Sequence, residues 1–321
     1  MNNTHRDKIV VIGAGNVGEA IAYTLMVRQQ ANDIVLIDVN EDRAKGAALD
    51  IGHGTGFFKQ VSVRNGGYEE CADAKMIIIT AGVARKPGQT RLELAQINVN
   101  IVRSITRNIM EHAENPLILV VSNPADITTM AVWKESGLPR HRVIGSGTSL
   151  DTARFRYLLS DRLNVNIEDV QAYMLGEHGD SQVPIYSSAQ IAGFPLEDFA
   201  KQMGVELNKE EITQKTKKGG AEIIGLKGAT FYGVAMSVSN IVEAISEDDN
   251  AILAVSHVLS DSFGDWAGIA ASLPCRVGWD GINQTLRLPM NEEEKKQMDE
   301  SIAVLKKFAI DAGVYTEKGD N

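Results

Sequence analysis

A glycine-rich turn near the start of the chain constrains its fold more than any other feature. The apolar run KIVVI, residues 8–12, leads directly into Gly13-Ala-Gly15-Asn-Val-Gly18, and an amphipathic segment follows. Gly13 allows a tight turn, and Gly15 lets the backbone approach a pyrophosphate held at the positive end of a helix. Gly18 lets helix and strand pack closely. This order of strand, turn and helix predicts a dinucleotide-binding unit, with Asn16 and Val17 also against the cofactor.

An acidic residue at the end of the second apolar run indicates which dinucleotide is bound. That run, residues 34–37, ends in Asp38, which is 20 residues beyond Gly18. A carboxylate at this point can bind both hydroxyls of an adenine ribose, whereas a 2′-phosphate would face a like charge. The pattern therefore predicts NAD rather than NADP as the cofactor. A glycine-rich turn in some other α/β domain is the alternative.

Further apolar runs predict a doubly wound parallel sheet with helices on both faces, which is a Rossmann fold. These runs cover residues 61–63, 76–80, 117–121 and 142–144, with helical or loop segments between them. After residue 145 the pattern changes to a long helix, short strands, a helix around Lys227 to Ile245 and a last helix opened by Asn291. We therefore expect an NAD-binding domain over 1–145 and an α+β catalytic domain over 146–321. The cleft between them is the expected substrate site.

Composition excludes several classes of function. The chain has 321 residues and a net charge of −10, which opposes nucleic-acid binding. No apolar run approaches the roughly 18 residues of a membrane helix, and the N-terminal segment does not look like a signal peptide, so a cytoplasmic protein is expected. Cys71 and Cys275 have no metal-ligand spacing, and we expect neither a metal site nor a disulfide.

Three ionisable residues in the second half indicate acid–base chemistry. His178 lies 27 residues after Asp151, and Arg154 follows Asp151 by three. A histidine titrates near neutrality, a carboxylate can fix its tautomer, and an arginine can bind a carboxylate through two hydrogen bonds. Together they predict proton transfer beside a bound organic acid. Separately, a structural histidine and an ordinary surface ion pair are the commoner outcomes.

Two further segments follow buried strands at the edge where doubly wound sheets bind ligands. The first, residues 82–92, contains glycine, proline and the cations Arg85, Lys86 and Arg91, and it is predicted to be a mobile loop. The second is Ser122-Asn123-Pro124, in which Asn123 can offer its amide to the same crevice. A simple turn is the alternative for Asn123, because Asn-Pro favours turns.

These motifs together resemble the L-lactate and malate dehydrogenase family over essentially the whole chain. The matching segments are Gly13-x-Gly15-x-x-Gly18, Asp38, Lys86-Pro-Gly-x-Thr-Arg91, Ser122-Asn-Pro124, Asp151-x-x-Arg154 and Gly176-Glu-His-Gly-Asp180. The resemblance implies an NAD-dependent oxidoreductase that interconverts a 2-keto acid and an L-2-hydroxy acid. It also implies a homotetramer.

The resemblance assigns a role to each motif residue. His178 is the proton donor and acceptor, and Asp151 orients and stabilises its imidazolium form. Arg154 binds the substrate carboxylate, and Arg91 polarises the carbonyl when the loop closes. Asn123 positions both the carbonyl and the nicotinamide, and Thr230 lies near the substituent of the substrate. Donors aimed at the oxygen that gains charge act most strongly where water is excluded.

Arg85 disagrees with the rest of the motif set. By the resemblance, the residue before Lys-Pro-Gly faces the variable substituent of the substrate, and malate-type members carry arginine there while lactate-type members carry glutamine. Pairing this guanidinium with a second carboxylate gains about 1.5 to 3 kcal/mol, and burying it unpaired beside pyruvate costs about 3 to 5 kcal/mol. We therefore predict oxaloacetate and malate as the favoured substrates. The alternative is an L-lactate dehydrogenase in which Arg85 does not contact the substrate, because Glu177 and Thr230 are lactate-like.

The sequence also bears on regulation and on two other functional classes. Family members activated by fructose 1,6-bisphosphate resemble one another in an arginine, here Arg156, and a histidine, which is Gln171 in this chain. Weak or no activation by sugar phosphates is therefore predicted. A nucleotide-sensing regulator is disfavoured by the intact His178 motif, and a metal-dependent glycosidase is disfavoured because no cysteine lies near the catalytic motifs.

Overall fold

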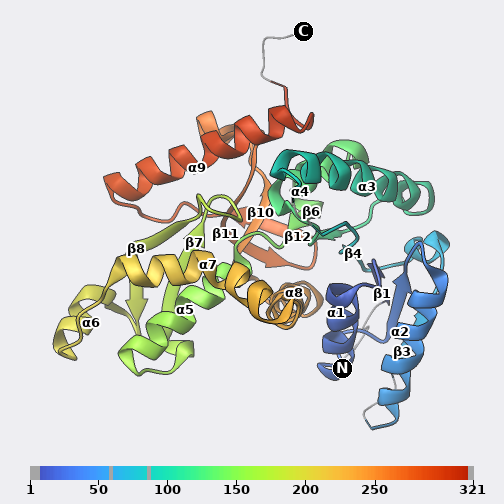
Figure 1. Ribbon diagram of the computed structural model, residues 1–321, viewed down its shortest axis with the longest axis horizontal. Coiled ribbons are helices and arrows are strands. Elements are labelled where there is room, and N and C mark those ends of the chain that lie inside the picture. The colour runs from blue at the N-terminus through green and yellow to red at the C-terminus, as the bar shows by residue number, and fades with distance from the viewer. Residues whose placement is uncertain (1–7, 58–60, 85–87, 317–321) are drawn as a thin grey trace.

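The computed structural model describes residues 8–57, 61–84 and 88–316, and its main feature is a large twisted sheet with helices on both faces (Figure 1). In this sheet the strands run in the order β12-β11-β10-β6-β5-β4-β1-β2-β3. They are β1 (Lys8–Ile12), β2 (Asp33–Ile37), β3 (Ser62–Asn65), β4 (Met76–Ile79), β5 (Ile118–Val120), β6 (Val143–Gly145), β10 (Ala251–Val258), β11 (Ala270–Gly278) and β12 (Gly281–Thr285).

A smaller sheet and the helices complete the architecture. The second sheet has the order β7-β8-β9, from β7 (Val170–Leu175), β8 (Val183–Ile191) and β9 (Phe194–Pro195). The helices are α1 (Asn16–Val27), α2 (Glu41–Gly54), α3 (Arg91–His112), α4 (Ala125–Ser136), α5 (Ser149–Leu163), α6 (Leu196–Gln202), α7 (Lys209–Lys227), α8 (Tyr232–Ser246) and α9 (Glu292–Asp311).

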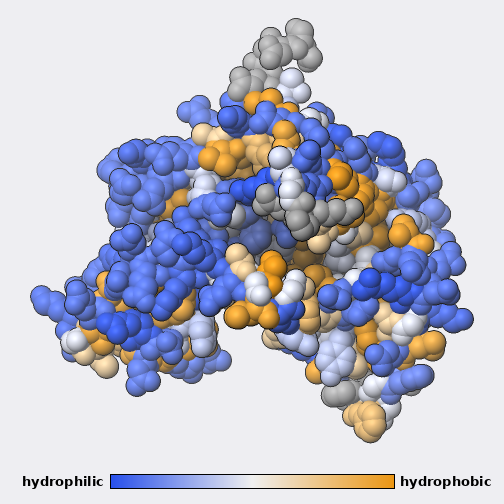
Figure 2. Space-filling view, in the orientation of Figure 1, coloured by the Kyte–Doolittle hydropathy of each residue, from blue (hydrophilic) through white to orange (hydrophobic). Residues whose placement is uncertain are grey.

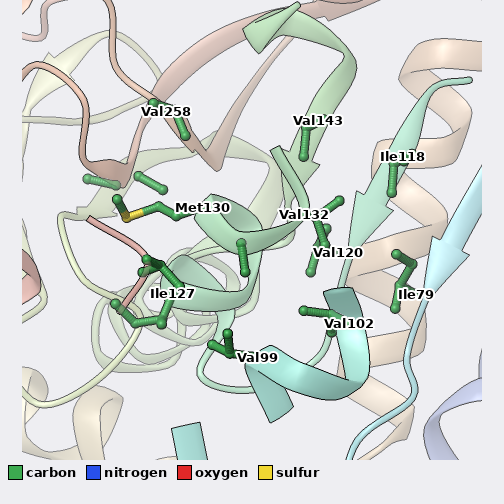
Figure 3. Close-up of a cluster of buried hydrophobic side chains, with 14 of the residues drawn as sticks. Ile79, Val99, Val102, Ile118, Val120, Ile127, Met130, Val132, Val143 and Val258 are labelled. Carbon is green, nitrogen blue, oxygen red and sulfur yellow. The ribbon is translucent and has the colours of Figure 1, made fainter. Parts of the chain in front are cut away.

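The alternation of side chains along β1 explains why the main sheet is covered on both faces. Val10 and Ile12 belong to a cluster that includes buried residues of α3, α4 and α9. Ile9 and Val11 point to the opposite face and belong to a cluster that includes α1, α2 and α8. All four side chains are buried, and burying each one fully stabilises the fold by about 1.5 to 3 kcal/mol. Figure 3 shows part of the first cluster, where Val102 and Val132 from the helices lie near the strand residue Val120.

The parallel part of the sheet confirms the predicted Rossmann fold. β1 pairs in parallel with β2 and β4, and β5 lies between β4 and β6, again in parallel. The predicted mobile loop of 82–92 is shorter than expected at its end, because Arg91 already begins α3. Thr90 caps this helix by accepting a hydrogen bond from the Glu93 amide, and the Glu93 carboxylate accepts one from the Thr90 amide.

The main sheet continues across the expected domain boundary at residue 145. β10 pairs antiparallel with β6 through Ser256 and Gly145, and β11 and β12 extend the sheet beyond β10. Helices α5, α6 and α7 instead share a separate cluster of buried residues with the smaller sheet. This cluster contains Phe155 and Leu159 of α5, which face Ala172 and Met174 of β7. The boundary itself stays a prediction.

Two helix predictions in the second half had different outcomes. The helix expected after Asn291 is α9, where Asn291 and Glu294 form a capping box and Met298 and Ile302 are buried. The single helix expected around Lys227 to Ile245 is wrong. Lys227 is the last residue of α7, Gly228 takes the left-handed conformation with φ +85, and α8 begins at Tyr232. Glycine at that position is a common helix terminator.

Candidate active site

The first turns of α5 place Asp151 and Arg154 on one face of the helix. Arg154 Nη1 lies 3.0 Å from Asp151 Oδ1, and the Asp151 side chain is only 2% exposed. The guanidinium of Arg154 lies under α7, where two consecutive glycines allow the helix to pass close by. A Cβ atom added to Gly219 would lie 3.4 Å from Arg154 Cδ, and one added to Gly220 would lie 3.7 Å from Nη2.

The segment after β7 brings His178 to Asp151. Gly176 has φ +86 and bridges to Ser272 of β11, and a Cβ there would lie 2.6 Å from Ser301 Oγ. Only glycine tolerates both conditions. Two residues later, His178 Nδ1 lies 2.6 Å from Asp151 Oδ2. Because this hydrogen bond occupies Nδ1, the imidazole has Nε2 for exchanging a proton, and its ring is 29% exposed.

The charges around this pair change the pKa of both groups. Burial alone would lower the pKa of His178, but the charge and hydrogen bond of Asp151 outweigh it and raise the pKa to about 9. Burial alone would raise the pKa of Asp151, but His178 and Arg154 lower it below its usual value. The structure therefore favours an imidazolium next to an ionised carboxylate at neutral pH. Such a pair has the chemistry to supply a proton beside an arginine that can hold a carboxylate.

Arg91 lies next to the same segment and is held by two carboxylates. Its Nη2 atom lies 3.0 Å from Glu177 Oε1, and its Nη1 atom lies 3.3 Å from Asp180 Oδ2. The two partners differ, because the Glu177 side chain is 4% exposed and that of Asp180 is 94% exposed. A Cβ added to Gly179 would lie 3.2 Å from Arg91 Nη2, so the guanidinium lies beside the residue that follows His178.

The other predicted substrate residues have different surroundings. Asn123 is exposed, and its backbone carbonyl accepts a 2.7 Å hydrogen bond from Asn98 Nδ2. Thr230 is half-buried in the connection between α7 and α8, three residues before Gly233, whose added Cβ would lie 3.1 Å from Leu150 Cδ1 next to Asp151. Arg85 lies outside the described residues, so the structure provides no contact for it.

The glycine-rich turn borders a cavity of about 570 Å³ at the carboxyl ends of β1, β2 and β4. Gly13, with φ +108, packs so tightly that an added Cβ would lie 2.6 Å from Thr80 Oγ1, and one on Gly18 would lie 1.8 Å from the Gly13 carbonyl oxygen. An added Cβ on Gly15 meets nothing within 4 Å. Two of the glycines are therefore required by the fold, while Gly15 faces open space, which suits the approach of a phosphate.

Asp38 lies on the rim of this cavity. Its Oδ2 atom accepts a hydrogen bond of 2.7 Å from the Ala14 amide, and its Oδ1 atom accepts one of 2.9 Å from the Asn40 amide. The carboxylate is thereby fixed, and each oxygen keeps a lone pair for a ribose hydroxyl. Asn16 and Val17 form the first turn of α1, where helix amide groups are suited to binding an anion. These residues fit a dinucleotide.

Sequence reasoning missed two polar residues that organise the site. Asp126, in the first turn of α4, accepts a 2.8 Å hydrogen bond from the His178 amide. Asn98 of α3 bonds the Asn123 carbonyl and also accepts a 2.9 Å hydrogen bond from the Val83 amide, which joins the two ligand-facing segments. The sequence did offer one sign of Asp126, because it lies only three residues after the predicted site residue Asn123. An acid in the first turn of a helix is common, however, and it usually interacts only with the helix end.

The prediction about sugar phosphates rests on Arg156 and Gln171. Arg156 Nε donates a 2.9 Å hydrogen bond to the Ala172 carbonyl, and its guanidinium stacks 5.0 Å from the centre of the Tyr173 ring. Gln171 is exposed on β7.

In the part of the chain that the structure describes, no helix is long and apolar enough to cross a membrane. Among the same residues, no group of three or more His, Cys, Asp or Glu side chains could hold a metal ion.

Two family models match almost the whole chain. The lactate/malate dehydrogenase NAD-binding domain matches residues 7–145, and the lactate/malate dehydrogenase alpha/beta C-terminal domain matches residues 148–315. Among curated relatives, the L-lactate dehydrogenase of Acetivibrio thermocellus is 42% identical over 310 residues, covering 96% of this chain and 98% of that one. L-lactate dehydrogenase 1 of Clostridium acetobutylicum is 42% identical over 302 residues, covering 93% and 96%.

Solved structures show the same similarity. A minor L-lactate dehydrogenase from Enterococcus mundtii, solved in a ligand-bound form, superposes with a TM-score of 0.93 at 40% identity and covers 98% of this chain and 100% of that chain. A lactate dehydrogenase from a deep-sea metagenome library of the Medee basin superposes with a TM-score of 0.94 at 37% identity, covering 97% and 100%.

Proposed function

Because this chain belongs to the lactate/malate dehydrogenase family and is an NAD-dependent oxidoreductase acting on CH–OH groups, we propose that it interconverts pyruvate and L-lactate with His178 as proton donor and acceptor. The observation that carries this proposal is the arrangement of His178, Asp151 and Arg154. It combines an imidazolium with a raised pKa and a guanidinium within one hydrogen-bonded unit.

The chain contributes binding, orientation and proton transfer. NAD bound along Gly13–Gly18 and Asp38 supplies the hydride chemistry. Arg154 binds the substrate carboxylate, so that the carbonyl oxygen faces Nε2 of His178. During reduction the imidazolium gives its proton to that oxygen, and during oxidation the neutral ring takes the proton back. Asp151 keeps the ring in the tautomer that has Nδ1 protonated.

Two further groups are proposed to act on the carbonyl. Arg91 stabilises the negative charge that develops on the oxygen, since its guanidinium lies beside the residue after His178. The amide of Asn123 orients the carbonyl against the nicotinamide, and Thr230 contacts the substituent of the substrate. Figure 2 shows hydrophobic residues gathered near the junction of α7 and α8, on the rim of the central hollow. An apolar wall there suits a methyl group.

The proposed substrate differs from the first prediction. Arg85 predicted oxaloacetate and malate, but the curated relatives at 42% identity and the solved structure from Enterococcus mundtii are named L-lactate dehydrogenases. These names support the alternative, in which Arg85 does not contact the substrate and Glu177 and Thr230 belong to a lactate-type pocket. We therefore propose pyruvate as the favoured 2-keto acid.

Steady-state kinetics with NADH tests this choice. We expect kcat/KM for pyruvate to exceed that for oxaloacetate, and we expect the ratio to change little in Arg85→Gln. A ratio that favours oxaloacetate and inverts in Arg85→Gln would instead make Arg85 the selector and the protein a malate dehydrogenase. His178→Asn is the control for the chemistry. It should still bind NADH, as followed by fluorescence, but lose turnover with both acids.

We also propose that the chain assembles as a homotetramer and responds weakly or not at all to sugar phosphates. Tyr232 and Met236 lie one turn apart on α8 and are 71% and 53% exposed, which provides an apolar surface for a second subunit. Sedimentation equilibrium should give four times the chain mass of 34.8 kDa. Activity assays with and without fructose 1,6-bisphosphate should give the same KM for pyruvate, because Gln171 lacks the charge of a histidinium.

A further inference from the structure

A buried carboxylate on α4 contacts the main chain of the proposed proton donor. Asp126 is 2% exposed and lies in the first turn of α4, three residues after Asn123. Its Oδ2 atom accepts a 2.8 Å hydrogen bond from the His178 amide, and its Oδ1 atom accepts one of 2.6 Å from Ser256 Oγ on β10. Both oxygens are therefore engaged inside the protein.

Burial of this carboxylate is costly, and its two hydrogen bonds offset only part of the cost. Burial raises the pKa of Asp126 to about 6, against the lowering effects of Ser256 and His178. A structural acceptor at this point need not carry a charge, because an asparagine has the same shape and can make both hydrogen bonds. An apolar side chain of similar volume would avoid the desolvation cost altogether. A charged residue here consequently calls for a reason beyond packing.

The neighbouring imidazole provides that reason. Asp151 of α5 binds the His178 ring at Nδ1, whereas Asp126 of α4 binds the same residue at its amide. The two contacts fix the ring at one end and the backbone at the other, and together they set the direction of Nε2. The charged groups that act on His178 are Asp151 and Asp126, which favour its protonated form, and Arg154, which disfavours it. Glu177, the residue before His178, acts on Asp126 as a like charge.

The first turn of α4 also joins two parts of the site. Asn123 directly precedes the cis peptide bond to Pro124, and Asp126 lies just beyond it. The helix that begins here therefore carries the predicted carbonyl-orienting amide at its start and holds the main chain of His178 one turn later. Both groups keep a constant spacing as long as the Asp126 contact is intact.

We propose that Asp126 is a positioning residue for the reaction, whose negative charge, held behind the His178 amide, keeps the imidazole protonated and aimed at the substrate oxygen. This inference rests on the proposed role of His178. It makes the charge of Asp126, and not only its hydrogen bonds, a requirement for reduction at alkaline pH.

Asp126→Asn separates charge from shape. The asparagine Oδ1 atom can accept from the His178 amide and its Nδ2 group can donate to Ser256 Oγ, so the packing is retained. We expect the alkaline limb of kcat/KM for pyruvate, near pH 9 in the parent protein, to move down by roughly one unit, the size of shift expected for loss of one nearby charge. At pH 9 this gives a rate about fivefold lower, with little change at pH 6.5.

Glu294→Gln provides a matched control. Glu294 is also a buried carboxylate, 6% exposed, and it accepts hydrogen bonds of 2.9 Å from the Tyr186 and Ser187 amides, but it lies on α9 away from the His178 segment. This variant should be less stable while its alkaline limb stays in place. An equal displacement of the limb in both variants would overturn the inference, as would a uniform loss of activity in Asp126→Asn at every pH.

A second readout does not depend on turnover. NMR titration of His178 with labelled histidine should show a lower imidazole pKa in Asp126→Asn, and an unchanged pKa would overturn the inference. If His178→Asn keeps normal turnover, the proposed function itself fails. If His178→Asn is inactive while Asp126→Asn titrates like the parent protein, only the inference about Asp126 fails.

Discussion

The guanidinium of Arg91 lies against the buried carboxylate of Glu177, with 3.0 Å between Arg91 Nη2 and Glu177 Oε1. The other side of the carboxylate is also engaged, because Glu177 Oε2 accepts from the Ser181 amide at 3.1 Å. Since Glu177 directly precedes His178, this contact places Arg91 beside the proposed proton donor before any substrate arrives. Arg91 therefore has less conformational freedom to lose when it approaches the carbonyl.

Glu177→Gln should lower kcat for pyruvate by about five- to tenfold. The charged hydrogen bond that holds Arg91 becomes a weaker neutral one, at a cost of about 1 kcal/mol. Asp180→Asn is the matched comparison, because Asp180 pairs with the same guanidinium from an almost fully exposed position. Exposed ion pairs contribute little, so this variant should stay within about twofold of the parent. Equal losses in the two variants would contradict the positioning role of Glu177.

The direction of the reaction should depend on pH through His178. Its pKa of about 9 means that the imidazolium, which gives a proton to the keto acid, persists until that pH. We expect kcat/KM for pyruvate to be level near neutrality and to fall above about pH 9, while kcat/KM for L-lactate rises toward the same pH. Initial rates in both directions across pH 6 to 10.5 test this, and parallel profiles in the two directions would contradict it.

Removing the charge of Asp151 should impair both proton transfer and the protonation of His178. Asp151→Asn keeps the shape of the side chain but loses the anion that raises the His178 pKa. General acid catalysis contributes roughly a hundredfold or more, so kcat for pyruvate should fall by about that factor at pH 7. The remaining activity should have its alkaline limb at a lower pH. Stopped-flow and steady-state assays across pH measure both effects, and retention of the parent limb would contradict the assignment.

How much of this site could be predicted depended on whether its signals were local. The spacing of Gly13, Gly15 and Gly18 and the capping box of Asn291 lie within a few residues, and Asp38 follows the turn at a recognisable distance along the chain, so these patterns predicted the turn, the cofactor and α9. The antiparallel pairing of β10 with β6 joins Ser256 to Gly145, and no local pattern encodes such a partner. The contact between Asp126 and the His178 amide is of the same kind, since it links residues 52 apart in sequence.

The cofactor preference should change when the carboxylate of Asp38 is removed. Asp38→Ser removes the carboxylate that repels a 2′-phosphate. Arg43 also lines the cavity and can pair with that phosphate. We expect the ratio of kcat/KM for NADH over NADPH to fall by one to two orders of magnitude, about 1.4 to 2.7 kcal/mol of preference. An unchanged ratio would mean that Asp38 does not face the ribose.

A buried histidine in the main sheet should make the protein sensitive to acid. His257 on β10 is 5% exposed, and its Nε2 atom lies 2.8 Å from Thr285 Oγ1. Burial, with a smaller contribution from the charge of Arg140, lowers its pKa to about 4. Between about pH 6.5 and pH 4 the unfolded chain binds a proton that the folded protein does not, so stability falls as the pH falls through this range. The largest possible loss from this group is about 3 kcal/mol.

His257→Gln isolates this contribution, because glutamine cannot take up the proton. The variant should be less stable than the parent at pH 7, where the hydrogen bond to Thr285 is disturbed, yet it should lose less stability between pH 6.5 and pH 4. Denaturant unfolding at a series of pH values gives, for each protein, the slope of the free energy of unfolding against pH. The exposed His53 provides a control of the same residue type, and its replacement by glutamine should leave the parent slope unaltered. If the His257 variant kept the full parent slope, His257 would not be the source of the acid sensitivity; Asp126 could not replace it, because its raised pKa of about 6 makes the folded protein gain stability as the pH falls.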